Sequence, residues 1–128
     1  MRINTRKVII MGKTAVYQGV NFSVKSVKTD KSYKGRQSPD GKTFLLLDLD
    51  MKNSGQVAMF YMFPNEELSL MADKEKISVD DHHIDNGIEK GQSGVCSVVF
   101  QIPETAKKMK LNFRSKKGDT ASMDIELK

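Results

Sequence analysis

The sequence predicts an all-β fold, in which about seven to eight antiparallel strands form a sandwich. Two observations lead to this prediction. Apolar and polar side chains alternate with a period of two in several short segments, as they do in strands that bury one face. Gly, Pro, Asn and Asp gather between these segments and mark turns, and only residues 104–109 have the pattern of a helical turn.

The C-terminal third has the clearest alternation. Residues 96–102, 109–114 and 121–127 each carry apolar side chains on one face and mainly polar side chains on the other. One apolar face per strand is typical of an antiparallel sheet that packs on one side and meets solvent on the other. We therefore expect three consecutive strands in this part of the chain.

Residues 43–52 give the strongest strand prediction, because apolar side chains occupy both faces at its start, as in a central strand. Residues 21–25, 57–63 and 68–71 are predicted to form further short strands, separated by turn signals. Together the segments favour an immunoglobulin-like β-sandwich that occupies residues 1–128 as a single domain. The shared core is predicted to contain Leu45, Leu47, Leu49, Val98, Phe100, Leu111 and Phe113.

Four sequence motifs carry a resemblance to a known family. They are GKTFLLLDL at residues 41–49, KNSG at 52–55, IEKGQS at 88–93 and VVFQIP at 98–103. In this order they resemble a bacterial family of immunoglobulin-like domains, whose members are similar to a mycobacterial secreted antigen, are often surface lipoproteins and mostly have no assigned function. The resemblance spans about residues 12–128 and implies the same fold. It also implies an extracytoplasmic or cell-surface location and a binding role, and it transfers no catalytic residue.

Residues 1–12 bear on location. Arg2, Arg6 and Lys7 precede a run of only four apolar residues, at positions 8–11. A signal sequence needs roughly 7 to 15 apolar residues and a membrane span about 20. We therefore expect no membrane span and no complete targeting segment in this chain, and a cytoplasmic location is the alternative to the surface location that the resemblance implies.

The charge is unevenly distributed along the chain. Residues 1–42 hold 10 Lys and Arg against 2 Asp and Glu, whereas residues 43–90 hold 4 against 10. The positive charge is densest around residues 31–42, a polar segment with two glycines and a proline that is predicted to be an exposed loop. The candidate partner-binding residues in and beside this loop are Lys28, Lys31, Tyr33, Lys34, Arg36 and Lys42.

Like charges placed so close together repel one another, so this basic loop is expected to need either solvent or an anionic partner. The expected partner is a protein or an anionic surface polymer. The alternative function is that of a cytoplasmic or mobile-element module that contacts nucleic acid through its basic regions.

A second polar segment holds potential metal ligands. The candidate residues are Asp80, Asp81, His82, His83 and Asp85. An extended segment would point His82 and Asp80 to one face and the other three side chains to the opposite face, so neither face would hold a complete tetrahedral ligand set. We therefore favour a polar surface loop over a metal site, and we expect no cofactor.

No residue pattern indicates an enzyme. Cys96 is the only cysteine, so it forms no internal disulfide, and the alternation places it on the inward face of a strand. Residues 35–43 resemble a phosphate-binding loop, but five residues, rather than four, separate the first glycine from the Gly-Lys pair. The chain is therefore predicted to be a non-catalytic binding or interaction domain.

Overall fold

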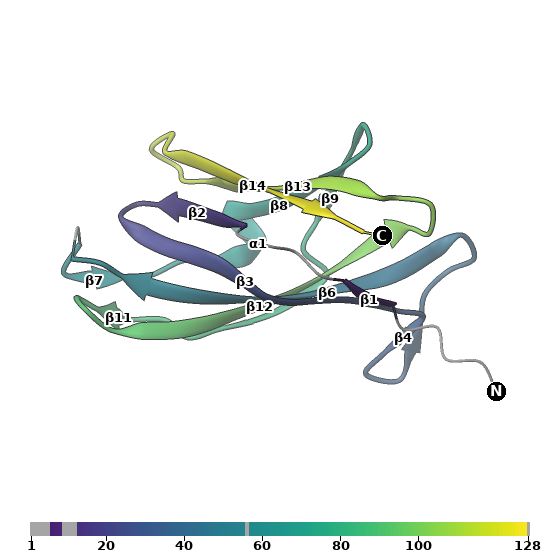
Figure 1. Cartoon of the computed structure of the whole chain (residues 1–128), viewed down its shortest axis with the longest axis horizontal. Helices are drawn as coiled ribbons and strands as arrows, with labels where there is room; N and C mark the ends of the chain where they lie inside the picture. Colours follow the sequence, from purple (N-terminus) through teal and green to yellow (C-terminus); the bar gives the residue numbers. More distant parts are fainter. Residues whose placement is uncertain (1–5, 9–12, 56, 128) are drawn as a thin grey trace.

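The computed structural model describes residues 6–8, 13–55 and 57–127, and in it two antiparallel sheets pack face to face (Figure 1). The predicted all-β sandwich is therefore confirmed. The larger sheet contains β1 (Arg6–Val8), β2 (Thr14–Tyr17), β3 (Val20–Asp30), β6 (Lys42–Asn53), β10 (Asp81–Ile84) and β12 (Ser93–Pro103). The smaller sheet contains β8 (Leu68–Ala72), β9 (Glu75–Ser78), β13 (Lys108–Arg114) and β14 (Thr120–Glu126). Two further pairs are β4 (Ser32–Tyr33) with β5 (Arg36–Gln37), and β7 (Met59–Phe60) with β11 (Ile88–Glu89).

The larger sheet is organised around β6, the strand that the sequence predicts to be central. It pairs along its length with β12 on one side and with β3 on the other. The register of β3 against β6 shifts between Val24 and Ser26. This irregularity explains why the alternation of residues 21–25 goes out of phase at Val27, which is buried.

The interior between the two sheets holds the side chains that the alternation predicts. Each of the seven predicted core residues is at most 1% exposed. Cys96 lies among them on β12 and is fully buried. Burial, with a smaller contribution from the charges of Asp48 and Asp85, raises the pKa of the thiol to about 12. At neutral pH the thiol is therefore protonated and acts as a small apolar side chain.

Four aromatic rings connect the sheets at one end of the sandwich. Tyr17 and Phe22 come from the larger sheet, Phe113 comes from the smaller sheet, and Phe60 comes from β7. The ring of Phe113 lies 4.8 Å from that of Phe22 and 5.3 Å from that of Tyr17, between ring centroids. Phe60 meets Tyr17 and Phe22 edge-on, at 6.4 and 6.0 Å. Such pairs add roughly 0.5–1.5 kcal/mol each to the free energy gained from burying the rings.

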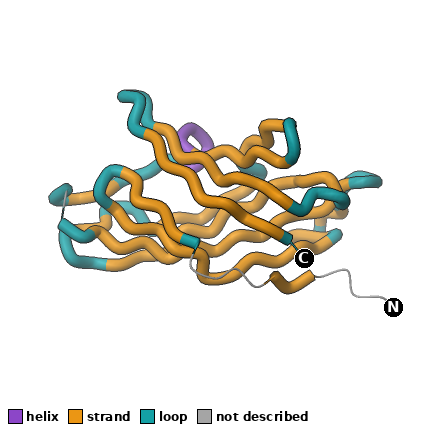
Figure 2. Tube along the Cα trace, turned by 45° about the horizontal axis from the view of Figure 1, so that its top comes forward, coloured by secondary structure: helices purple, strands orange, loops and turns teal. Residues whose placement is uncertain are grey.

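Outside the candidate sites, two segments differ from their predicted structure. The strand predicted at residues 57–63 is reduced to β7, and a short helix, α1 (Pro64–Glu67), follows it (Figure 2). Proline suits the first turn of a helix because it has no N–H to leave unpaired. The helical turn predicted at residues 104–109 is instead a turn that leads into β13.

Asn53 fixes the chain where β6 ends, inside the KNSG motif. Its side chain is fully buried, and its Nδ2 donates to the carbonyl oxygens of Val57 and Ile88, both at 3.0 Å. Its Oδ1 accepts a hydrogen bond from the N–H of Gly55 at 3.1 Å. One amide side chain therefore ties the β6–β7 connection to β11.

We expect Asn53→Leu to lower the free energy of unfolding by roughly 1–3 kcal/mol, because it removes the donor to one buried and one part-buried carbonyl oxygen. Urea unfolding followed by circular dichroism measures this loss. Ser54→Ala, at the exposed neighbouring position, serves as the control and should cost less. A loss in Asn53→Leu no larger than in the control would contradict this role of Asn53.

Candidate functional site

The basic loop predicted at residues 31–42 contains a β-hairpin, formed by β4 and β5. Its turn consists of Lys34 and Gly35, which both adopt positive φ angles, 49° and 77°. Two consecutive positive φ angles are typical of the tightest hairpin turns. The hairpin lies against the face of the larger sheet that points away from the smaller sheet (Figure 1).

Tyr33 and Arg36 cover an apolar side chain on this outer face. Phe44 points outward from β6, yet it is only 1% exposed. The ring of Tyr33 lies 5.7 Å from the ring of Phe44, and the guanidinium of Arg36 lies 5.3 Å from it. Two of the six candidate partner-binding residues are therefore packed onto the domain itself.

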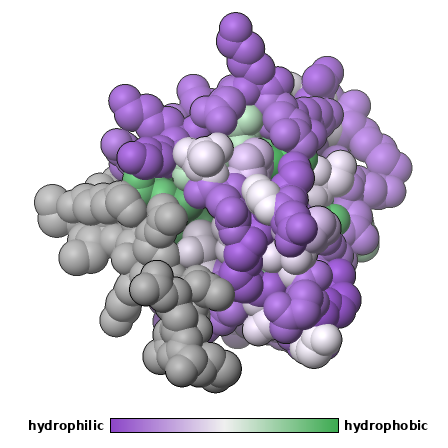
Figure 3. Space-filling view, turned by 90° about the vertical axis from the view of Figure 1, so that its right-hand side faces the viewer, coloured by the Kyte–Doolittle hydropathy of each residue, from purple (hydrophilic) through white to green (hydrophobic). Residues whose placement is uncertain are grey.

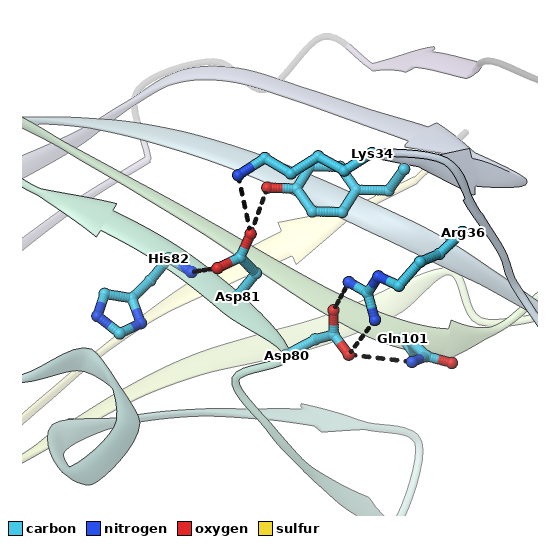
Figure 4. A network of polar contacts seen from close by, with 7 residues as sticks. Lys34, Arg36, Asp80, Asp81, His82 and Gln101 are labelled. Atoms are coloured by element: carbon cyan, nitrogen blue, oxygen red, sulfur yellow. Dashed lines mark hydrogen bonds and ion pairs between the residues drawn. The ribbon is translucent and has the colours of Figure 1, made fainter.

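The hairpin is also bound to two carboxylates beside β10 (Figure 4). Asp81 Oδ2 accepts hydrogen bonds from the Tyr33 hydroxyl at 2.7 Å and from Lys34 Nζ at 3.2 Å. Asp80 accepts from Arg36 at 2.5 Å and from the Gln101 amide at 3.0 Å. The hydrogen bond from Tyr33 is the main cause that lowers the pKa of Asp81, to about 2, and the one from Arg36 lowers the pKa of Asp80.

The other basic candidates are distributed around the same end of the sandwich. Lys31 forms an ion pair with Glu104, and Lys42 Nζ lies 3.6 Å from Glu75. Lys28 is exposed on β3 and has no carboxylate partner among the described residues. The surface seen from this end is mainly hydrophilic (Figure 3).

The loop's positive charge, expected to need solvent or an anionic partner, is thus largely balanced within the domain. Lys31, Lys34, Arg36 and Lys42 each have a carboxylate nearby. These ion pairs oppose the binding of a polyanion, because such a ligand would have to compete with carboxylates that are already in place.

The candidate metal ligands do not assemble. Residues 81–84 form the edge strand β10, rather than the loop that was expected. Asp80 and Asp81 both contact the hairpin, whereas Asp85 accepts a hydrogen bond from the Val95 N–H at 3.0 Å and lies 3.7 Å from His83. Over residues 6–8, 13–55 and 57–127, no three His, Cys, Asp or Glu side chains are grouped to hold a metal ion.

The opposite end of the sandwich exposes apolar side chains. Val16, Tyr61 and Phe63 are 61, 54 and 57% exposed. All three line one open hollow of about 900 Å³, at the end where Figure 1 places β2, β7 and β11. Its walls are the β2–β3 turn, the segment from β7 to α1 and the β13–β14 turn.

Tyr17 and Glu67 hold the first two of these walls together. The ring of Tyr17 is buried in the aromatic cluster, and its hydroxyl donates to Glu67 Oε1 at 2.5 Å. Glu67 Oε2 accepts from the N–H of Phe63 at 2.7 Å and so closes the first turn of α1. Burial and the adjacent carboxylate raise the pKa of Tyr17 well above its ordinary value. Strand alternation then points the neighbouring Val16 outward.

The third wall is fixed by hydrogen bonds around Asp119. Its N–H donates to Ser115 Oγ at 3.0 Å, and its Oδ2 accepts from Gln18 Nε2 at 3.3 Å. The second bond links the β13–β14 turn to the β2–β3 turn. Lys116 and Lys117, at the tip of this turn, have no carboxylate partner in the part of the chain that the structure describes.

A second hollow, of about 480 Å³, adjoins the first. Phe63 and Glu66 line both hollows, and His82 and Ile84 of β10 line the second one. Asn86 borders it and accepts a hydrogen bond from the Met62 N–H at 3.0 Å. We call the two adjoining hollows together the end groove.

The end groove was not predicted from the sequence. Tyr61 and Phe63 lie in a segment that was predicted to be a short strand, and Val16 carried no functional prediction. One signal was present: residues 57–63 are apolar on both faces and end at Pro64, which leaves some of those side chains without a place in the core.

The fold and the groove define an antiparallel β-sandwich domain with an exposed apolar end. The chain belongs to the DUF4352 family, a domain family of unknown function whose model matches residues 9–122. This match agrees with the expected family of mostly unknown function, whereas membership of the immunoglobulin-like lipoprotein family stays a prediction. No curated protein matches the chain significantly.

Three solved structures have the same fold. YcdA, a candidate lipoprotein of Bacillus subtilis, is 17% identical with a TM-score of 0.70, covering 88% of this chain and 38% of that one. A conserved hypothetical protein of Bacillus anthracis is 12% identical with a TM-score of 0.64, covering 94 and 99%. An uncharacterised β-sandwich protein of Clostridium difficile is 11% identical with a TM-score of 0.52, covering 90 and 91%. This chain thus spans little more than a third of the YcdA structure.

The described ranges hold no helix that is long and apolar enough to cross a membrane.

The low pKa of Asp81 predicts how the hairpin responds to acid. Its ordinary pKa is 3.8 and its folded-state value about 2, so its contribution to stability is fully present above about pH 4 and is lost as the pH falls through about 2. We expect the free energy of unfolding to fall less steeply over this range in Asp81→Asn than in the parent. Urea unfolding at several pH values measures both slopes, with Asp124→Asn as the exposed control. Equal slopes for parent and Asp81→Asn would show that the hydrogen bonds from Tyr33 and Lys34 to Asp81 do not stabilise the domain.

The hydroxyl of Tyr17 predicts a response to alkali. Tyr17→Phe keeps the ring but removes the hydrogen bond to Glu67, and should cost roughly 1–2 kcal/mol at neutral pH. Because the pKa of Tyr17 is raised above 10.0, its contribution is present below about pH 10 and is lost as the pH rises through the higher folded-state value. Tyr17→Phe should therefore lose less stability than the parent above pH 10 in urea unfolding.

Tyr61→Phe is the matched control, because it removes the hydroxyl of an exposed tyrosine of the same groove. It should change the free energy of unfolding by less than about 0.5 kcal/mol. If both variants unfolded like the parent at every pH, the bond between Tyr17 and Glu67 would have no structural role.

Proposed function

We propose that this chain is a non-catalytic binding domain that contacts a protein partner through the end groove. The exposure of Val16, Tyr61 and Phe63 in one hollow is the observation that supports this function most directly. Contiguous exposed apolar surface marks interaction sites, and aromatic side chains dominate the energetics of protein interfaces. The three positions contribute little to the folded core, so their apolar character is best explained by contact with a partner.

The groove is suited to binding because its walls are tied to the core. Glu67 joins β2 to α1, and Asp119 joins the turns of β2–β3 and β13–β14. A site that is already shaped loses little conformational entropy when a partner binds, so more of the contact energy appears as affinity.

Two observations support a role without catalysis. Cys96, the only thiol, is buried, and its raised pKa keeps it protonated at neutral pH. The carboxylates beside β10 accept hydrogen bonds from the hairpin, and so they are engaged in holding the fold.

We further propose that the domain acts at the bacterial cell surface or in an envelope assembly. The likeness to a candidate lipoprotein of Bacillus subtilis supports this location. The alternative, contact with nucleic acid through the basic residues, is less well supported, because the hairpin cations are paired with carboxylates of the same domain.

Binding experiments with matched variants test the groove. The groove variant combines Val16→Thr, Tyr61→Ser and Phe63→Ser, and the hairpin variant combines Lys28→Ser, Lys34→Ser and Arg36→Ser. Three probes are applied to the parent and to both variants. They are a phage-displayed library of random dodecapeptides, an array of bacterial cell-wall glycans and a single-stranded oligonucleotide. We expect peptides, rather than glycans or the oligonucleotide, to bind specifically to the parent and the hairpin variant, and not to the groove variant.

The groove variant should unfold within about 0.5 kcal/mol of the parent for each exposed substitution, so lost binding would not reflect lost folding. Probes that bind the groove variant as well as the parent would contradict the proposal. Binding of the oligonucleotide that the hairpin variant alone loses would favour the nucleic-acid function instead.

A further inference from the structure

We infer that the end groove takes an extended peptide segment that carries charges of both signs around a central apolar side chain. This inference rests on the proposed function and names the chemistry of the partner. The apolar side chain would pack against Tyr61 and Phe63, a basic side chain would meet Glu66, and an acidic side chain would meet Lys116 and Lys117.

The dimensions of the groove favour an extended ligand. The first hollow alone holds about 900 Å³, near the upper limit of roughly 1,000 Å³ for small-molecule sites. The second hollow adds about 480 Å³ and shares Phe63 and Glu66 with the first. A ligand that fills both must cross Phe63, whose side chain is 57% exposed between them. A chain molecule fits this shape better than a compact one.

The polar groups of the groove favour a peptide over a neutral glycan. A neutral glycan is held largely by hydrogen bonds to side chains, which require donors and acceptors that are free. Three acceptor groups are already used within the domain: the Glu67 carboxylate by Tyr17 and Phe63, Asp119 Oδ2 by Gln18 and Ser115, and Asn86 Oδ1 by the Met62 N–H. The apolar side chains, in contrast, remain exposed.

The charges that remain are of opposite sign and lie on different walls. Glu66 projects from α1 and borders both hollows, whereas Lys116 and Lys117 stand on the β13–β14 turn and border only the first. None of the three has an ion-pair partner among the residues that the structure describes. The carboxylate therefore lies nearer the second hollow than the lysines do, and this asymmetry sets the direction in which a peptide with charges of both signs would bind.

Charge reversal tests the inference. Peptides selected by the parent from the random dodecapeptide library are sequenced, labelled, and titrated by fluorescence anisotropy. We expect an aromatic or aliphatic residue flanked by Lys or Arg on one side and by Asp or Glu on the other. Glu66→Lys and the pair Lys116→Glu with Lys117→Glu should each weaken binding by roughly threefold to tenfold, as expected for pairs at a solvent-exposed rim.

Peptides with the two charges exchanged should recover affinity for the variant that combines all three reversals, which no general loss of structure would produce. Glu126→Lys and Lys107→Glu, exposed positions outside the groove, serve as matched controls and should bind like the parent. Rising salt should weaken parent binding, because exposed charges are screened.

The outcomes separate this inference from the function on which it rests. If peptides bind through Tyr61 and Phe63 but charge reversal leaves their affinity unchanged, the inference is wrong and the binding function stands. Groove-dependent binding of glycans without any peptide selected would contradict both the inference and the protein partner of the proposed function. If no probe depends on the three apolar side chains, both are wrong.

Discussion

The four-ring cluster of Tyr17, Phe22, Phe60 and Phe113 is the contact on which the rest of this end of the molecule depends. It places the last residue of β2, the short strand β7 and the end of β13 at fixed positions relative to one another. The chain leaving each of these three strands forms one wall of the end groove. Interior packing of this kind is dense and tolerates little rearrangement. Because the walls begin at these packed strands, we expect their positions to be fixed as well.

The two ends of the sandwich differ in whether their apolar and charged side chains are covered or paired within the domain. At the hairpin end, Arg36 lies over an outward-facing Phe44, and carboxylates of the same domain pair with Arg36 and Lys34. At the groove end, the core is closed by the cluster, and Val16, Tyr61 and Phe63 beyond it are more than half exposed. The first arrangement satisfies its own polar and apolar groups, whereas the second leaves apolar surface available. We therefore propose that the domain binds its partner at the end that leaves apolar surface exposed, rather than at the end with the most charge.

Much of the fold could be predicted from the sequence because strand alternation is a local property. The period-two pattern placed Leu47 and Phe100 in the core without any knowledge of their partners. The pairing of the hairpin with Asp80 and Asp81 could not be predicted, since these residues lie more than forty positions from Tyr33 and Arg36. Only the path of the strands brings them together.

The site was harder to predict for a related reason. An apolar residue in a strand-like segment is normally assigned to the core, and Tyr61 and Phe63 lie in such a segment but are exposed in the structure. The chain forms α1 directly after Phe63, before it enters the smaller sheet as β8, and both side chains are more than half exposed. A local pattern shows that a side chain is apolar, whereas only the fold shows whether the core has room for it.

The central claim is that the groove is preformed and fixed to the aromatic cluster. Native-state hydrogen exchange at the amides of Met62 and Phe63 tests it most directly, because both donate to groove side chains, Asn86 and Glu67. We expect these amides to exchange with a protection free energy close to that of amides in β6, which open only when the domain unfolds. Exchange at the rate of an unstructured peptide, while β6 stays protected, would contradict a preformed groove.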